Sequence, residues 1–322
     1  MAEHYSGKRE SADFQKIRDA ARRIAPYIHR TPVMSCQTLN SISGADLRFK
    51  CENFQKMGAF KIRGAANAVF SLPDEVALKG VCTHSSGNHA QAVAMAAKQR
   101  GVPATIIMPE NASSVKRNGV LGYGGEVISC EPTLEAREKA ANEVIERKGV
   151  EFIHPYNDSR VIAGQATAAL ELLEQTDSLD MIVAPVGGGG LLSGTALAVK
   201  HLMPQIKVIA AEPKGADDAY QSFQSGSFVP CVNPQTIADG LRTSTGSLTL
   251  PIILEQVDDI LTVTEEGIVR AMRLIWERMK IVVEPSGAVP FAAVLEHPET
   301  FAGRRVGLIL SGGNVDLKQL PF

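Results

Sequence analysis

The feature that most constrains the fold of this 322-residue chain is a repeated order of elements. Short apolar runs are followed by a turn and then by a stretch with helical spacing of apolar residues. This order is typical of parallel strands joined by crossover helices, since parallel strands cannot be connected by a tight turn. The sequence therefore predicts an α/β protein. Strands are predicted at residues 81–83, 104–108, 126–129, 181–186, 207–211, 260–263 and 306–310, and helices at 90–99, 134–147, 166–173, 193–201 and 265–279.

Three of the predicted strands end in clusters of glycine and small polar residues. In open α/β sheets, ligands bind at the carboxyl ends of the strands. We therefore expect these clusters to form one site from distant parts of the chain. They are Ser85-Ser86-Gly87-Asn88, Gly187-Gly188-Gly189-Gly190 and Ser311-Gly312-Gly313-Asn314.

Charge and composition exclude several classes of function. Hydrophobic residues make up 44% and charged residues 21% of the chain, which is ordinary for a globular protein. The formal net charge of -2 leaves no basic surplus, so we expect neither a nucleic-acid nor a membrane partner. The longest uncharged stretch, residues 181–199, contains four consecutive glycines and is better explained as strand, loop and helix than as a membrane span.

The five cysteines are scattered, form no CxxC pair and have no histidine at a metal-ligand spacing. This usage is typical of free thiols in a reducing compartment. The N-terminal segment is polar and lacks the apolar core of a signal peptide. We therefore expect a cytoplasmic protein.

The glycines from Gly187 to Gly190, with Leu191, follow an apolar strand and open a helix. Their bare backbone amides and the helix dipole suit a phosphate group. No Gly-Lys-Ser/Thr follows, and the spacing is not that of a dinucleotide fingerprint, so a nucleotide is not indicated. The alternative is a tight strand-to-helix turn that binds nothing.

Lys61 stands among small residues at the predicted start of a helix, in the segment GAFKIRGA at residues 58–65. A helix N-terminus disfavours positive charge and helps to depress the pKa of a lysine. A neutral amine is what Schiff-base chemistry requires. The alternative is an exposed lysine on a helix face, which is the usual role of a single lysine.

Ser85-Ser86-Gly87-Asn88-His89 presents hydroxyls, an amide and backbone N–H groups at a helix start, which suits a carboxylate. A simple helix cap is the alternative. At another strand end, two carboxylates and a carbonyl suit a hard cation such as Mg²⁺ or Ca²⁺, and a solvated acidic turn is the alternative. The residues concerned are Glu212, Ala216 and Asp218.

Together these segments resemble one family. The ordered set KxRGA, SSGNHAQA, GGGGLLSG, TIADG, RMKIVVEPSGA and SGGNVD is similar to the fold-type II pyridoxal-phosphate enzymes that include serine/threonine dehydratases and, with the nearest resemblance, serine racemases. The resemblance runs from about Ile17 to Leu317. It implies a tryptophan synthase β-like fold of two open, twisted, mainly parallel sheets flanked by helices. It also implies a small mobile domain, residues 76–155, inserted into a large cofactor-binding domain, residues 1–75 and 156–322.

The resemblance assigns roles to the strand-end residues. It implies that Lys61 holds pyridoxal 5'-phosphate as a Schiff base and that Phe60 packs near the ring. Asn88 is implied to bond the ring hydroxyl and Ser311 the pyridine nitrogen. The phosphate is assigned to Gly187, Gly188, Gly189, Gly190 and Leu191, and the substrate carboxylate to Ser85, Ser86, Gly87, Asn88 and His89.

The implied reaction is dehydration of a small 3-hydroxy amino acid such as L-serine or L-threonine to a 2-oxo acid and ammonia. Lys61 is implied to take the Cα proton. A hydroxyl instead of an acid at the ring nitrogen favours rapid β-elimination. Ser86 stands where serine racemases carry serine, and a hydroxyl opposite Lys61 implies serine racemase activity as well.

Two alternatives stay open. A 3-hydroxyaspartate ammonia-lyase shares these motifs and needs a cation for the distal carboxylate, for which Arg137 and Arg242 are candidates. Tyr156 lies at a position that shapes the side-chain pocket. A non-catalytic phosphate or nucleotide sensor also keeps glycine loops, but the retention of Lys61 with the other motifs argues against it.

The resemblance further implies a divalent cation, Mg, Mn or Ca, because Glu212, Ala216 and Asp218 match the cation site of the family in spacing. It implies a homodimer with an amino-acid substrate as its small-molecule partner.

A nucleotide site between subunits, with ATP as an effector, is implied by Lys56, Met57 and Tyr123, although Cys36 replaces a more typical hydroxyl nearby. The chain ends soon after Ser311, so we expect no regulatory module and no feedback control by isoleucine.

Overall fold

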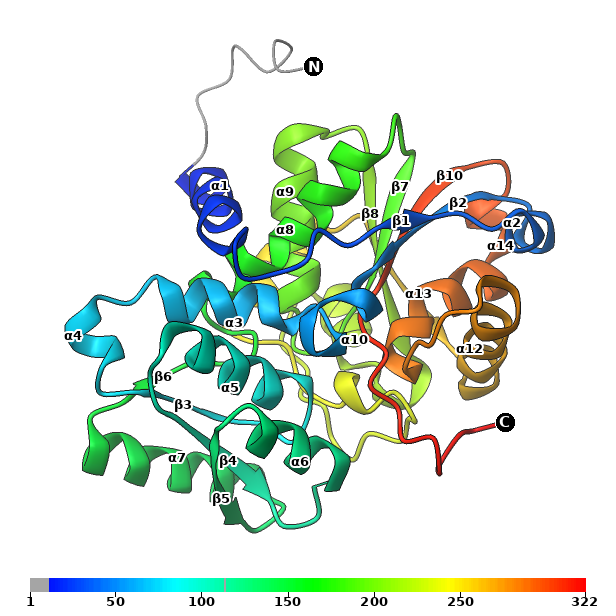
Figure 1. Cartoon of the computed structure of the whole chain (residues 1–322). Helices are drawn as coiled ribbons and strands as arrows, with labels where there is room; N and C mark the ends of the chain where they lie inside the picture. Colours follow the sequence, from blue (N-terminus) through cyan, green and yellow to red (C-terminus); the bar gives the residue numbers. More distant parts are fainter. Residues whose placement is uncertain (1–11, 113) are drawn as a thin grey trace.

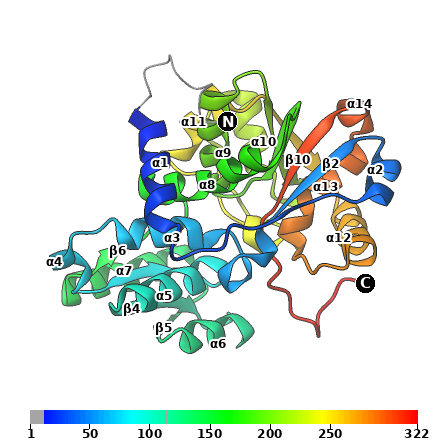
Figure 2. The same cartoon turned by 45° about the horizontal axis from the view of Figure 1, so that its top comes forward.

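The computed structural model describes residues 12–112 and 114–322, whose strands form two sheets (Figure 1). The larger sheet has six strands and the smaller has four. Figure 2 shows the small sheet and its helices lying to one side of the large sheet. Helices cover both sheets, so the predicted α/β class with mainly parallel sheets is confirmed. No helix of the described residues is long and apolar enough to cross a membrane.

The six-stranded sheet has the order β1-β2-β10-β7-β8-β9. All neighbours pair in parallel except β1 and β2, which are antiparallel. The last strand of the chain therefore lies beside β7 in the middle of the sheet, which brings the loops after both strands together. The strands are β1 (Val33–Met34), β2 (Asp46–Cys51), β10 (Arg305–Leu310), β7 (Met181–Pro185), β8 (Lys207–Pro213) and β9 (Asp259–Val263).

Alternate side chains of the large sheet enter two separate cores. Phe49 and Val183 pack on one face under α2, α12, α13 and α14, and Ile182 and Val208 pack on the other under α1, α8, α9 and α11. Successive strand residues point to opposite faces, so a sheet covered on both sides needs apolar residues in both phases. The helices are α1 (Ala12–Ile24), α2 (Gln37–Ser43), α8 (Ser159–Gln175), α9 (Gly190–Leu202), α11 (Thr249–Gln256), α12 (Glu265–Met279), α13 (Pro285–Glu296) and α14 (Pro298–Phe301).

The four-stranded sheet has the order β5-β4-β3-β6 and is entirely parallel. Ile106 packs on one face with α3, α5 and α6, and Cys82 and Ile107 pack on the other with α7. Its elements are β3 (Val81–His84), β4 (Ala104–Pro109), β5 (Glu126–Cys130), β6 (Glu151–Phe152), α3 (Lys61–Phe70), α4 (Asp74–Ala77), α5 (Asn88–Arg100), α6 (Ser114–Gly122) and α7 (Leu134–Lys148).

Every strand and helix that the sequence predicts is present, but β1, β2 and β6 are not predicted. The strand β2 is instructive because Arg48 and Lys50 interrupt its apolar run. Nevertheless Lys50 is fully buried. A buried ammonium needs partners that the local sequence does not contain.

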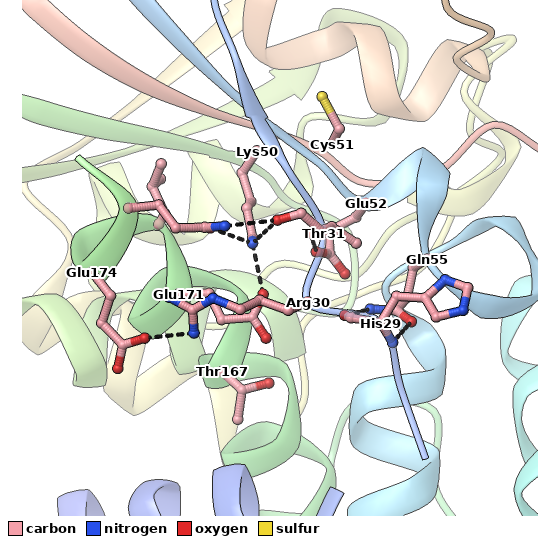
Figure 3. A network of polar contacts seen from close by, with 12 residues as sticks. His29, Arg30, Thr31, Lys50, Cys51, Glu52, Gln55, Thr167, Glu171 and Glu174 are labelled. Atoms are coloured by element: carbon pink, nitrogen blue, oxygen red, sulfur yellow. Dashed lines mark hydrogen bonds and ion pairs between the residues drawn. The ribbon is translucent and has the colours of Figure 1, made fainter. Parts of the chain in front are cut away.

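Those partners come from distant segments (Figure 3). The Lys50 Nζ donates to the Thr31 carbonyl at 2.7 Å, to the Glu171 carboxylate at 2.6 Å and to the Gln175 side chain at 2.8 Å. These bonds use all three donors of the ammonium. The strand β2 is thus held to α8 by a charged group inside the core.

Arg63 completes the same buried network. Its guanidinium is fully buried and donates to both Glu52 oxygens at 2.7 and 2.8 Å, to both Glu171 oxygens at 2.8 Å, and to the Thr167 hydroxyl at 3.1 Å. Every N–H of the guanidinium is therefore paired, and two carboxylates balance the charges of Arg63 and Lys50. The network fixes the first turn of α3 against β2 and α8.

Candidate active site

The first residue of α3 is Lys61, and the end of β10 holds it in place through the backbone. Ala59 forms a β-bridge with Gly312, and the Phe60 N–H donates to the Ser311 carbonyl at 3.0 Å. The structure therefore brings Lys61, Phe60 and Ser311 together at the carboxyl end of β10.

The Lys61 side chain is half-buried. Its Nζ donates to the Pro155 carbonyl at 2.9 Å and lies 5.1 Å from the centroid of the Phe60 ring. Burial lowers the pKa of this ammonium to about 8, against the opposing charge of Glu284. At pH 7 about 10% of such an amine is neutral, far more than at an ordinary lysine. Lys61 therefore has the protonation chemistry of a nucleophilic amine.

The loop from Gly187 to Leu191 joins β7 to α9 and is buried throughout. Among the described residues, no acceptor takes a hydrogen bond from its backbone N–H groups. Gly189 has a φ of 87°, and a Cβ on Gly188 would lie 2.2 Å from the Tyr156 ring, so both positions require glycine. Because Tyr156 follows Pro155, the loop lies next to the partner of Lys61.

The segment from Ser85 to His89 joins β3 to α5. The Ser85 hydroxyl accepts from the Gly87 N–H at 3.2 Å, so it is already engaged. His89 is buried, and its Nε2 lies 3.1 Å from the Ile153 carbonyl, which means that Nε2 carries the proton. Its Nδ1 has no hydrogen-bond partner among the described residues. Burial, and then the charge of Lys61, holds the pKa of His89 well below its ordinary value, so the ring is neutral.

Asn88 connects the β3 loop to the β10 loop. Its Nδ2 donates to Glu284 at 2.7 Å, and its Oδ1 accepts from the Asn314 side chain at 2.9 Å. Glu284 precedes α13 and is 3% exposed. The three strand-end clusters therefore meet in one place, with Lys61 beside them.

Sequence reasoning missed Glu284. Burial raises the pKa of this carboxyl group to about 8, reinforced by the charge of Asp239. The sequence did contain a signal, because Glu284 precedes a proline at a helix start in the motif RMKIVVEPSGA and glutamate is not a favoured N-cap residue. In the structure its side chain makes no cap hydrogen bond.

The comparisons with known proteins decide the family. A family model described as pyridoxal-phosphate dependent enzyme matches residues 24–312. The β-hydroxyaspartate dehydratase of Paracoccus denitrificans is 51% identical over 96% of this chain and 98% of its own, and the serine racemase of Dictyostelium discoideum is 53% identical over 94% and 95%. The chain belongs to the pyridoxal-phosphate dependent enzymes.

A solved structure agrees with this assignment. Maize serine racemase matches with a TM-score of 0.94 and 50% identity, covering 96% of this chain and 95% of its own. The predicted fold-type II architecture and the enzyme class, a pyridoxal-phosphate dependent lyase or racemase, are therefore confirmed. The alternative of a non-catalytic sensor has no support.

The residues of this pyridoxal-phosphate enzyme fit the cofactor. A half-buried amine with a lowered pKa suits an aldehyde, and amides that have no acceptor among the described residues, at the start of the thirteen-residue helix α9, suit a phosphate. The individual roles of the predicted cofactor and substrate residues remain proposals.

The candidate cation site of the enzyme is strongly acidic. Glu212 is fully buried and accepts from the Ala219 and Tyr220 N–H groups at 3.0 and 2.8 Å, and burial raises its pKa to about 9. Both carboxylate oxygens of Asp218 are buried without a hydrogen-bond partner among the described residues. Residues 12–112 and 114–322 contain no group of three or more His, Cys, Asp or Glu side chains that could hold a metal. The candidate cation site has only two such side chains, and its third ligand is the backbone carbonyl of Ala216.

The two candidate arginines for a distal carboxylate differ in position. Arg242 is exposed, and its guanidinium is tied to the Thr236 carbonyl. The charge of Arg137, after burial, lowers the pKa of His84. The His84 ring lies 6.2 Å from that of His154, next to Pro155 and hence to Lys61. The charge of Arg137 also lowers the pKa of Tyr156 against burial, so of the two arginines it is the one that acts on groups near Pro155.

Two of the predicted nucleotide residues belong to one packing cluster. Met57 is buried in the same cluster that Tyr123 packs against, and Lys56 precedes Met57 in a short 3-10 helix, η2 (Lys56–Gly58). Cys36 is half-buried before α2. No contact of these residues indicates a ligand.

Proposed function

We propose that this enzyme removes water from small L-3-hydroxy amino acids and releases a 2-oxo acid and ammonia. The observation that carries the proposal is the Lys61 amine, which is half-buried, donates to the Pro155 carbonyl and has a pKa lowered to about 8. The names of the relatives, serine racemase and β-hydroxyaspartate dehydratase, support chemistry at Cα and Cβ of such amino acids.

Each part of the site then has a task. Pyridoxal phosphate, when bound, draws electrons away from Cα of an amino acid. The Lys61 Nζ takes the Cα proton, and the backbone N–H groups from Gly87 to His89 hold the substrate carboxylate. The loop from Gly187 to Leu191 holds the cofactor phosphate, and Ser311 faces the ring nitrogen.

Racemisation of serine is proposed as a second activity. It needs a proton donor on the face of Cα opposite Lys61. The Ser85 hydroxyl is occupied by the Gly87 N–H, whereas the Ser86 hydroxyl makes no hydrogen bond within the described part of the chain. Accepting that bond turns the Ser85 oxygen toward the backbone, whereas no such bond orients the Ser86 hydroxyl among the described residues, and Ser86 is therefore the proposed proton donor.

A 3-hydroxyaspartate is the second candidate substrate, and the position of Arg137 favours it. A distal carboxylate beside His84 and His154 meets the Arg137 guanidinium, which is held at one N–H by the Thr133 carbonyl at 3.2 Å. A charge-assisted hydrogen bond of this kind contributes about 1.5–3 kcal/mol.

The deciding experiment measures 2-oxo acid release from L-serine, L-threonine and the 3-hydroxyaspartate isomers, with chiral analysis of the residual serine. The purified protein should be yellow and should turn over at least one of these substrates. A colourless protein that takes up no added pyridoxal phosphate would overturn the proposal. A preference for a hydroxyaspartate of more than about tenfold in kcat/KM, or about 1.4 kcal/mol, would make the second candidate the physiological one.

We also propose that Glu212, the Ala216 carbonyl and Asp218 bind Mg²⁺, Mn²⁺ or Ca²⁺. Two buried carboxylates, one of them without a hydrogen-bond partner among the described residues, call for the counter-charge that a divalent ion supplies. Added Mg²⁺ should raise the thermal unfolding temperature of chelator-treated protein, and Asp218→Asn should abolish the rise. An unchanged unfolding temperature at millimolar Mg²⁺ would reject the site.

The small domain, residues 76–155, is proposed to close over the substrate, because Ser85 to His89 belong to it and the glycine loop does not. Solution scattering should show compaction when substrate is added.

A homodimer, ATP as an effector and a cytoplasmic location complete the proposal. All five cysteines are free, which suits a reducing compartment. Light scattering checks the dimer, and the dependence of activity on ATP concentration checks the effector.

A further inference from the structure

The orientation of the Asn88 amide follows from its neighbours. The Asn314 Nδ2 donates to the Met57 carbonyl at 2.8 Å, and a carbonyl can only accept, so this atom of Asn314 is the nitrogen. The same nitrogen donates to Asn88 at 2.9 Å, so the atom it meets is Oδ1. The Asn88 Nδ2 must therefore face Glu284, as it does at 2.7 Å.

This orientation leaves one N–H of Asn88 without an acceptor in the described part of the chain. The Nδ2 has two hydrogens, and Glu284 takes one. Among the described residues, no acceptor takes the other. The remaining donor lies on the first residue of α5. Its neighbour Glu284 is also the carboxyl group whose charge acts on Lys61.

Glu284 does little for its own helix. Its side chain makes no cap hydrogen bond to α13, and its Oε2 is buried without a partner among the residues of the described structure. The backbone of Gly312 packs against the carboxyl group so closely that a Cβ there would lie 2.4 Å from Oε1. Burying a carboxyl group with one oxygen unpaired costs stability, so a helix start alone does not account for this residue.

We propose that Glu284 is a positioning residue for the cofactor: it accepts from Asn88 and so fixes the amide with one N–H left for the ring oxygen of pyridoxal phosphate. Asn314 fixes the amide from the opposite side through Oδ1. The inference rests on the proposed binding of that ring oxygen by Asn88. Glu284 acts on the cofactor only through Asn88.

The test measures the dissociation constant of pyridoxal phosphate, by absorbance and fluorescence titration, for the wild type and for Glu284→Gln, Glu284→Ala, Asn88→Ala and the double variant. Glu284→Gln should stay within about threefold of the wild type, because its amide oxygen still accepts from Asn88. Glu284→Ala should weaken binding about tenfold, the size of one lost hydrogen bond. In the Asn88→Ala background, Glu284→Ala should have no further effect.

A purely structural role predicts a different pattern. Glu284→Ala would then weaken binding by the same factor whether or not Asn88 is present, and that result would overturn the inference, as would an equal loss in the Gln and Ala variants. If Glu284→Ala does not fold, Glu284→Met keeps the length of the side chain without an acceptor and should show the same dependence on Asn88.

The matched control is Glu296→Ala, at the other end of α13. Glu296 accepts from the Thr264 N–H at 3.0 Å and is remote from the strand-end clusters. This variant should lower the unfolding temperature and leave the dissociation constant unchanged. If the wild type binds pyridoxal phosphate and Glu284→Ala binds it equally tightly, this inference alone is overturned. If the wild type binds no pyridoxal phosphate, the proposed function itself is overturned.

Discussion

The two sheets contribute to the site in different ways. The residues that follow β7 and β10, from Gly187 to Leu191 and Ser311, are buried, whereas those at the end of β3, from His84 to Asn88, are half-exposed. A group that stays bound between turnovers suits a buried cradle, and a substrate that enters and leaves needs an accessible one. We call these the cofactor side and the substrate side.

Replacement of Lys61, where the two sides meet, has the largest expected effect. Lys61→Ala removes the proposed base, so 2-oxo acid release should fall at least about 10³-fold, measured with excess pyridoxal phosphate. Lys98→Ala, on the exposed face of α5, is the control and should keep its activity. A Lys61→Ala rate within tenfold of the wild type would show that another group takes the Cα proton.

Ser86→Ala separates the activities on the substrate side. Racemisation of L-serine should fall about 10²-fold because the second proton donor is lost, while elimination should change by less than about tenfold. Chiral chromatography and 2-oxo acid release measure the two rates, and the cofactor dissociation constant should not move. Ser85→Ala, which alters the neighbouring hydroxyl, should affect both reactions alike. If Ser86→Ala slowed racemisation and elimination by the same factor, Ser86 would have no specific role in racemisation.

Arg137→Met sharpens the assignment of the substrate. Loss of a charge-assisted hydrogen bond should raise KM for 3-hydroxyaspartate about 10- to 150-fold and leave KM for L-serine within about threefold. Arg242→Met is the matched control, because that side chain is exposed and tied to Thr236. If Arg137→Met changed KM for both substrates by the same factor, Arg137 would not bind the distal carboxylate.

The smallest effect concerns stability against pH in the cofactor-free chain. The pKa of Glu284 is raised from 4.5 to about 8 by burial, so the folded chain holds a proton there that the unfolded chain releases. Stability should therefore fall as pH rises between those values. The pKa of Lys61 is lowered by burial from 10.5 to about 8, so its contribution should rise with pH between about 8 and 10.5.

Thermal unfolding from pH 5 to 10 checks both slopes. Glu284→Gln should flatten the first and Lys61→Met the second. Asp239 and Lys116 also face Glu284 and should shift the midpoint without reversing the slope. Curves for wild type and Glu284→Gln that stay parallel would show that Glu284 does not titrate in this range.

Much of the site could be predicted from the sequence because it is built from local patterns. A strand, a glycine loop and a helix start are contiguous, so the loop at Gly187 and the cluster at Ser85 are visible in a short window. The parallel sheet then implies that such loops converge.

Other parts of the site were invisible for a physical reason. The value of a buried polar group depends on its partners, and those partners lie far away in the chain: Asn88 and Glu284 are 196 residues apart, and Lys50 and Glu171 are 121 residues apart. When its partners are not known, a lysine at position 50 makes a buried strand β2 unexpected, and Glu284 has no feature that distinguishes it from an ordinary acidic residue before a proline.

The sequence by itself determined the class of fold, the family and the three clusters at the strand ends, because the spacing of apolar residues and glycines acts over a few residues. Only the tertiary structure decided which charges are buried, which carboxyl group faces Asn88, and which of the two arginines acts on His84 and Tyr156. Burial removes water from a charged group, and the compensating hydrogen bonds exist only after distant segments have packed together.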